Sequence, residues 1–97
     1  MNFVDFKKSL SEANPPNDLS AYLLSMWHDA KGDCNKAHEI IQDVEDKTAS
    51  WIHAYLHRKE GDVGNADYWY SKAGKQRPNL SLEEEWKDIS EALMNKH

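Results

Sequence analysis

Two histidines one helical turn apart are the residues of this sequence best placed to do chemistry. His53 and His57 lie in the segment HAYLH. The i, i+4 spacing puts both imidazoles on one face of a helix, where they can reach one Zn²⁺ or a similar ion. A metalloprotease helix would need glutamate at position 54, and alanine stands there instead. The spacing therefore allows a metal site but does not match that protease motif.

A closed metal site needs further ligands, and His28 is the first candidate. It stands 29 residues before His57, at the equivalent point of an internal repeat, and stacked repeats would bring the two side chains near each other. Asp29 and His38 are further candidates. The competing interpretation is that His53 and His57 lie beside the apolar stripe of a helix and bond only to neighbouring carbonyls or carboxylates. A metal or ligand site on His28, His53 and His57, with hydrolysis as one use, is therefore the alternative prediction, and no resident metal is expected.

Other reactive side chains give weaker signals. Cys34 has His38 at i+4, and a cysteine in the first turn of a helix can have a lowered pKa. No motif supplies an oxyanion hole or a third orienting group, so Cys34 is interpreted as a small apolar residue near a turn. The segment SLEEEWKD is better explained as an acidic helix start than as a catalytic carboxylate pair. Because there is also no glycine-rich phosphate loop and no CxxC pair, we expect no cofactor and favour a protein that is not an enzyme.

Composition limits the class of protein. The 97 residues are enough for one small domain, and 39% hydrophobic and 10% aromatic content argues against disorder. A net charge of −5 counts against nucleic acid and anionic lipid as partners. The N-terminus does not read as a signal peptide, and no stretch reaches the ~20 apolar residues of a membrane span. A soluble cytoplasmic protein without a membrane partner is the simplest interpretation.

Apolar spacing predicts helices throughout and no strands. We expect one all-α domain over residues 1–97 with about six helices. Its parts are an N-terminal helix (2–13), a first helical hairpin (18–45), a second hairpin (48–74) and a C-terminal capping helix (81–96). Asn17 or Asp18 is the expected cap of the first hairpin and Thr48 that of the second, while Ser81 with Glu84 matches a capping box.

An internal repeat relates the two hairpins. A shift of 29 residues superposes the corners Gly32-Asp33 and Gly61-Asp62, in which glycine suits a helix end and aspartate the next helix start. Apolar positions coincide as well, including Ala37 with Ala66. Each hairpin carries more apolar surface than it can bury alone, so the pattern predicts two hairpins that lie side by side and share one hydrophobic seam.

These residues resemble a known family. The segment GDVGNADYWYSKAG, followed by Pro78, is similar to the second half of a tetratricopeptide repeat, and a looser copy precedes it. The resemblance covers about residues 18–78 and implies a right-handed stack of helix–turn–helix units that recognises a protein segment or small ligand. It implies a groove lined by the first helix of each unit. The expected lining is Tyr22, Met26, His28, Asp29, Trp51, His53, Tyr55, His57 and Arg58, with Tyr68 as an exposed contact.

A second resemblance is to small bacterial proteins that carry a Trp-His…Gly-Asp…His-Ala-Tyr-Leu-His pattern, here Trp27-His28, Gly32-Asp33 and HAYLH. It implies no particular activity. Two repeats are few, since about three are usually needed for a stable stack. The flanking helices, or dimerisation of two copies through an exposed face, would supply the missing unit. The leading prediction is therefore a non-enzymatic binding or scaffold module with a protein or peptide partner.

Overall fold

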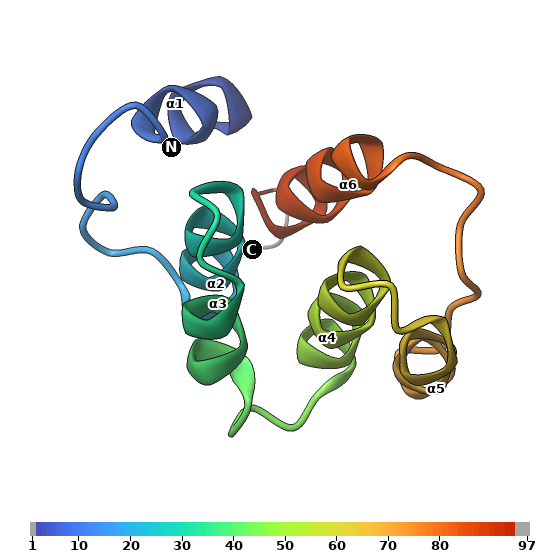
Figure 1. Ribbon diagram of the computed structural model, residues 1–97. Helices are drawn as coiled ribbons and strands as arrows, with labels where there is room; N and C mark the ends of the chain where they lie inside the picture. Colours follow the sequence, from blue (N-terminus) through green and yellow to red (C-terminus); the bar gives the residue numbers. More distant parts are fainter. Residues whose placement is uncertain (1, 95–97) are drawn as a thin grey trace.

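The computed structural model describes residues 2–94, and these residues fold into helices without any strand, as predicted (Figure 1). The helices are α1 (Phe3–Ser9), α2 (Ala21–Ala30), α3 (Cys34–Ile41), α4 (Lys47–Lys59), α5 (Val63–Lys72) and α6 (Leu82–Met94). Residues 95 and 96, which were expected at the end of the last helix, lie outside the described range. Within that range no helix has the length and apolar character that crossing a membrane requires.

The two predicted corners have the same local structure. Gly32 and Gly61 adopt φ angles of 87° and 84°, a left-handed conformation that glycine reaches without a steric penalty. The next residue in each corner, Asp33 or Asp62, donates its backbone N–H over 2.9 Å to a carbonyl five residues earlier. Both aspartate side chains then accept a backbone N–H in the first turn of the following helix. The repeat seen in the sequence is therefore present in the geometry of its turns.

Two of the predicted helix starts were wrong. Ser20 caps α2, while Asp18 has a φ of 67° in the turn before it. Asp46 rather than Thr48 caps α4. Both true caps are Ser or Asp residues with an extended backbone conformation. Other residues that can cap a helix lie within three positions of each, so the sequence alone did not single out the right one. The capping box of α6 is confirmed, because the backbone N–H of Ser81 donates to the Glu84 carboxylate and the N–H of Glu84 donates to the Ser81 hydroxyl, each over 3.1 Å.

The hairpins α2–α3 and α4–α5 pack side by side through α3 and α4. Ala37 and Ala66, which are equivalent in the repeat, are fully buried, and their small side chains let the paired helices approach closely. One large core joins apolar side chains of α1, α2, α3, α4 and α6, and a smaller cluster of Ala54, Ala66 and Tyr70 holds α5 against α4. The two hairpins therefore share one large core, and α5 is attached to α4 through the separate, smaller cluster.

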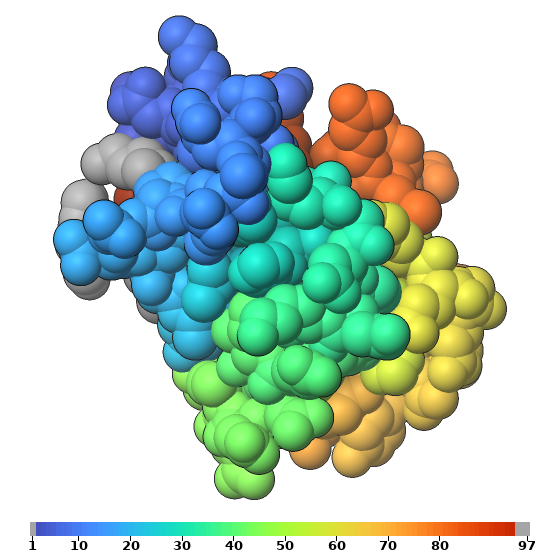
Figure 2. Space-filling view, turned by 60° about the vertical axis from the view of Figure 1, so that its left-hand side comes forward, coloured from blue at the N-terminus to red at the C-terminus, as the bar shows by residue number. Residues whose placement is uncertain are grey.

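The last helix occupies a position that decides what the fold can bind. α6 packs against α1, α2 and α4, across the first helices of both hairpins, and Figure 1 shows it beside α2 and α4. The indole N–H of Trp86 donates over 3.0 Å to the carbonyl of Met26, and the Trp86 ring stacks on Phe6 at 5.8 Å. The N-terminal segment also lies against the first hairpin (Figure 2), and Lys31 Nζ donates to the carbonyls of Leu10 and Glu12.

Candidate ligand cavity and histidine cluster

A cavity of about 550 Å³ lies where α1, α2, α4 and α6 meet. Its largest apolar walls are Phe3 and Trp86, whose rings are tilted with centroids 5.9 Å apart. The lining residues are Phe3, Lys7, Leu10, Asp29, Ala30, Tyr55, Lys59, Leu82, Glu83, Glu84, Trp86 and Lys87. The cavity therefore combines an apolar surface with charged groups from four helices.

Asp29 is the most deeply buried charged group of this cavity, with 1% of its surface exposed. Its carboxylate accepts a hydrogen bond from the Tyr55 hydroxyl over 3.1 Å and from Lys59 Nζ over 3.0 Å. Burial, followed by the Asp29 charge, raises the pKa of the Tyr55 hydroxyl above its ordinary value of 10.0. Tyr55 therefore remains a neutral donor that keeps Asp29 in place.

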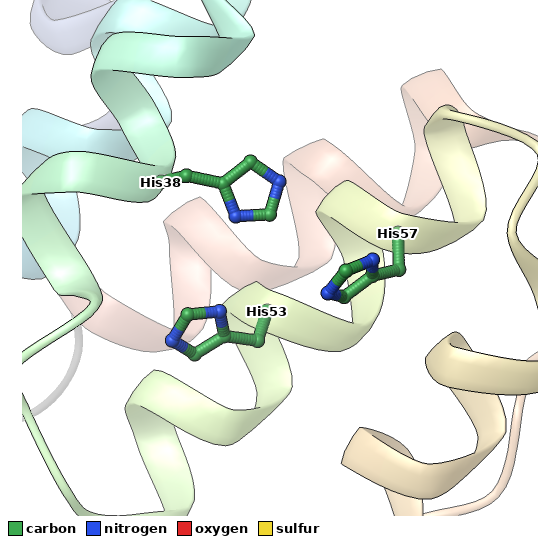
Figure 3. A group of neighbouring side chains, drawn as sticks. All are labelled: His38, His53 and His57. Carbon is green, nitrogen blue, oxygen red and sulfur yellow. The ribbon is translucent and has the colours of Figure 1, made fainter.

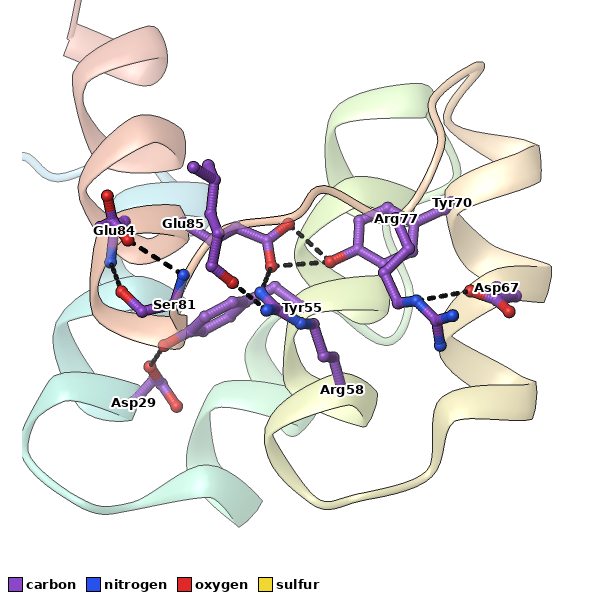
Figure 4. Close-up of polar contacts among 10 residues, drawn as sticks. Asp29, Tyr55, Arg58, Asp67, Tyr70, Arg77, Ser81, Glu84 and Glu85 are labelled. Atoms are coloured by element: carbon purple, nitrogen blue, oxygen red, sulfur yellow. Dashed lines mark hydrogen bonds and ion pairs between the residues drawn. The ribbon is translucent and has the colours of Figure 1, made fainter.

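The neighbouring polar network fastens α6 to both helices of the second hairpin (Figure 4). Arg58 donates over 2.8 Å to Glu85, which is 1% exposed, and also to the carbonyl of Leu80. The Tyr70 hydroxyl lies 2.7 and 2.5 Å from the two Glu85 oxygens. Burial and the bond to Glu85 raise the pKa of Tyr70. The buried carboxylate thus receives donors from α4 and α5 at the point where the chain enters α6.

On the opposite side of α4, three imidazoles converge (Figure 3). His38 reaches from α3 toward His53 and His57 of α4, and one ring nitrogen from each lies within 4.8 Å of the other two. The His38 ring centroid is 5.9 Å from that of His53 and 5.2 Å from that of His57. The group joins the two hairpins through side chains of the kind that transition metals favour.

The environment of the cluster favours neutral imidazole at its inner member. Burial is the main cause that lowers the pKa of His53 below 6.5, and the nearby His38 adds to it. The backbone carbonyl of Ile41 acts in the opposite direction and raises the pKa of His53, and the His53 ring stacks on Trp69 with centroids 4.4 Å apart. The His53 ring is thus fixed in place, deprotonated near neutral pH, and able to offer a lone pair.

Carboxylate and thiol groups border the cluster. Glu60 Oε1 lies 2.6 Å from His38 Nε2, and Cys34 forms a second close group with these two residues, again with ligand atoms within 4.8 Å. Cys34 begins α3 as predicted, but burial and the Glu60 charge raise its pKa. A raised pKa disfavours the thiolate, which agrees with the interpretation of Cys34 as a small apolar residue rather than a nucleophile.

The structure corrects the predicted third histidine. His28 does not belong to the cluster, and its ring instead meets the edge of Trp27 at a centroid distance of 5.1 Å. Equivalent positions of adjacent repeats point the same way, so His28 and His57 are displaced by one hairpin rather than turned toward each other. His38, on the second helix of the first hairpin, faces α4 and takes that place.

The remaining predicted contacts have mostly structural surroundings. Met26 is fully buried beneath Trp86. The Tyr22 hydroxyl donates to Asp46, which raises its pKa. Lys75 Nζ lies 4.2 Å from the centre of the half-buried Trp51 ring. Tyr68 is 56% exposed, as expected for a surface contact residue.

Sequence reasoning missed Lys59, Glu85 and Trp86 as parts of these sites. For Glu85 a signal was present: it lies three residues after Leu82 and four before Ile89, on the apolar stripe of the last helix. A glutamate at such a position needs a buried donor.

Comparisons with protein-family models, curated proteins and solved structures found no match to this chain.

Proposed function

We propose that this protein is a non-enzymatic binding module that holds a small ligand with an apolar body and one acidic group in the cavity between α1, α2, α4 and α6. The observation that carries the proposal is the cavity itself. Its volume of about 550 Å³ lies within the usual range for small-molecule sites, and its walls mix aromatic and charged side chains as such sites do.

Two lysines at the rim of the cavity are the groups that an acidic ligand would contact. Asp29 and Lys59 are paired with each other at 3.0 Å, and the Glu84 carboxylate is held by the backbone N–H of Ser81. Lys7 and Lys87 lie at the rim beside the apolar walls of the cavity, where Glu83 adds a carboxylate and Lys87 also pairs with Glu91 at 3.6 Å. Two ammonium groups next to an aromatic wall suit a ligand whose carboxylate or sulfonate stays near the surface while its apolar part enters.

The position of α6 favours a small ligand over a peptide. In a tetratricopeptide-like module a bound segment would lie along the first helices of the hairpins, which are α2 and α4 here. α6 packs across both, and Trp86 and Glu85 bond to groups of α2 and α4 at that face. A peptide would have to displace this helix, whereas a small molecule needs only the space that α6 leaves beside α1.

A tetratricopeptide-like origin of the two hairpins belongs to the same proposal. Its support is the repeated corner, with matching glycine φ angles and matching aspartate caps 29 residues apart. Further support comes from the buried alanines Ala37 and Ala66 at equivalent positions. In this view α6 acts as the extra element that two repeats need in order to bury their apolar faces.

Fluorescence of 8-anilinonaphthalene-1-sulfonate tests the ligand site, because this probe has an aromatic body and one acidic group. We expect saturable binding of the probe. Decanoate should displace the probe at a concentration at least about tenfold lower than decylamine, a ligand of equal chain length and opposite charge. Ala30→Trp should block the cavity, since Ala30 lies exposed at its edge. Ala21→Trp, an exposed position on the same helix away from the cavity, is the matched control.

Charge variants separate this site from unspecific adsorption. Lys87→Ala should weaken decanoate binding about fivefold, whereas Lys36→Ala on α3, another exposed lysine, should leave it unchanged. Equal displacement by decanoate and decylamine, or equal binding by the Ala30→Trp and Ala21→Trp variants, would contradict the proposal.

A further inference from the structure

We propose that His38, His53 and His57 bind one divalent transition-metal ion, of which Zn²⁺ is the best probe, and that this ion links the two hairpins. The first observation is the convergence of three ligand nitrogens within 4.8 Å of one another from two helices (Figure 3). A tetrahedral ion with Zn–N bonds of ~2.0–2.1 Å requires nitrogens roughly 3.3 Å apart. The two half-buried rings, His38 and His57, would rotate toward the ion to close that difference.

The second observation is that groups around the rings orient them as in metal sites. Metal-bound histidines usually give their other ring N–H to a carbonyl or carboxylate, which fixes the tautomer. His38 has Glu60 Oε1 in this role, at 2.6 Å from its Nε2. The Asp62 carboxylate lies farther from His57, at 3.8 Å from its Nδ1. The bond to Glu60 therefore leaves the second ring nitrogen of His38 for an ion, and Asp62 is the nearest carboxylate that could orient His57.

The third observation is the kind of ligand atom. Imidazole nitrogens suit Zn²⁺, Ni²⁺, Co²⁺ or Cu²⁺ and disfavour Mg²⁺ and Ca²⁺, which require oxygen ligands. His38 and His57 are 25% and 24% exposed, so a fourth ligand from solvent can reach the ion from their side.

Isothermal titration of the full chain, purified without a histidine tag and treated with EDTA, tests the site. We expect one Zn²⁺ per chain at pH 7.5 and no binding of Mg²⁺ at the same concentrations. His38→Ala and His57→Ala should each weaken Zn²⁺ binding more than about 100-fold, and Glu60→Gln about tenfold, as the loss of an outer partner does. His28→Ala is the matched control and should stay within about twofold of the parent chain.

Two further readouts keep the test decisive if a variant is unstable. Far-UV circular dichroism establishes that each variant is helical before it is titrated. Co²⁺ added to the parent chain should give the visible absorption of a tetrahedral site, and one equivalent of Zn²⁺ should remove it. Absence of one-to-one Zn²⁺ binding, or a His28→Ala variant as weak as His57→Ala, would overturn the proposal. Because the cavity beside α1 and α6 shares no residue with this cluster, binding of decanoate is a separate result and does not depend on Zn²⁺.

Discussion

The two polar faces of α4 use opposite arrangements. Toward α2 and α6, the donors Tyr55, Arg58 and Lys59 each meet a carboxylate, Asp29 of α2 or Glu85 of α6, so positive and neutral donors are matched to buried acceptors. Toward α3, His53 and His57 meet another histidine, so three groups of the same kind gather, and the carboxylates of Glu60 and Asp62 lie only at the exposed edge of the group. Matched pairs hold helices together. A cluster of three imidazoles contributes little stability by itself, and it becomes favourable when the three rings share one metal ion.

The comparison predicts that variants on the α6 face unfold the protein, while variants on the α3 face change what it binds. The largest effect is expected for Arg58→Ala, which leaves the buried Glu85 carboxylate without its cationic partner. We expect the free energy of unfolding to fall by about 3 kcal/mol, measured by urea denaturation. Arg77→Ala removes an exposed pair with Asp67 and should cost less than about 1 kcal/mol. Equal losses for the two arginines would refute the structural role of the Arg58–Glu85 pair.

A smaller loss is expected for Tyr55→Phe. This change removes the hydroxyl that donates to Asp29 but retains the buried ring, and Asp29 keeps Lys59 as a partner. Loss of one hydrogen bond to a buried carboxylate should lower the free energy of unfolding by about 1.5 kcal/mol, measured in the same way. Tyr68→Phe alters an exposed tyrosine and should change it by less than about 0.5 kcal/mol. A Tyr55→Phe variant with an unchanged free energy of unfolding would show that Lys59 alone satisfies Asp29.

His57→Ala sharpens the contrast from the other face. In metal-free buffer with EDTA this variant should lose less than about 1 kcal/mol of stability, because His57 is partly exposed and its Asp62 partner lies 3.8 Å away. In the parent chain, saturating Zn²⁺ should raise the melting temperature, since an ion that binds only the folded state stabilises it. The variant should lose most of that rise. A destabilisation in EDTA as large as that of Arg58→Ala would mean that the cluster is structural.

The smallest effect concerns the start of α6. The N–H of Ser81 lowers the pKa of Glu84 below its ordinary value of 4.5, so the ionised carboxylate stabilises the folded state above that pH. This contribution is lost as the pH falls through the lowered value. Stability of the parent chain should therefore approach that of Glu84→Gln when the pH drops from 6 toward 3. Glu83→Gln removes the same charge from the same turn without the capping bond and serves as the control. A stability difference that stays constant down to pH 3 would contradict this role.

Local patterns were enough to predict the six helices and the two glycine–aspartate corners, but not the caps of α2 and α4. Gly61 and Asp62 act through their own backbone and the next few residues, so both corners could be read directly. The position of α6 could not, because Trp86 bonds to the carbonyl of Met26, a contact 60 residues apart in the chain. Without that contact, residues such as Met26 and Tyr55 were expected to line an open groove, and in the folded protein α6 covers them.

The histidine site was predictable only in part. His53 and His57 were identified because i, i+4 spacing is a property of a single helix. The third member depends on how the hairpins meet. The repeat favoured His28 because it is equivalent to His57. Equivalent side chains of two stacked repeats point in the same direction, however, so they lie one repeat apart and do not meet. His38 could have been preferred by noting that the second helix of one hairpin faces the first helix of the next, which is the α3–α4 contact seen here.

Nuclear magnetic resonance of the imidazole nitrogens tests most directly whether the two faces of α4 differ as described. The ¹⁵N-labelled full chain is titrated with Zn²⁺ at pH 7.5. The account predicts that the ring signals of His38, His53 and His57 change together and stop changing at one equivalent, while those of His28 stay in place. Signals of His28 that move in step with the others, or three cluster histidines that do not respond, would contradict it.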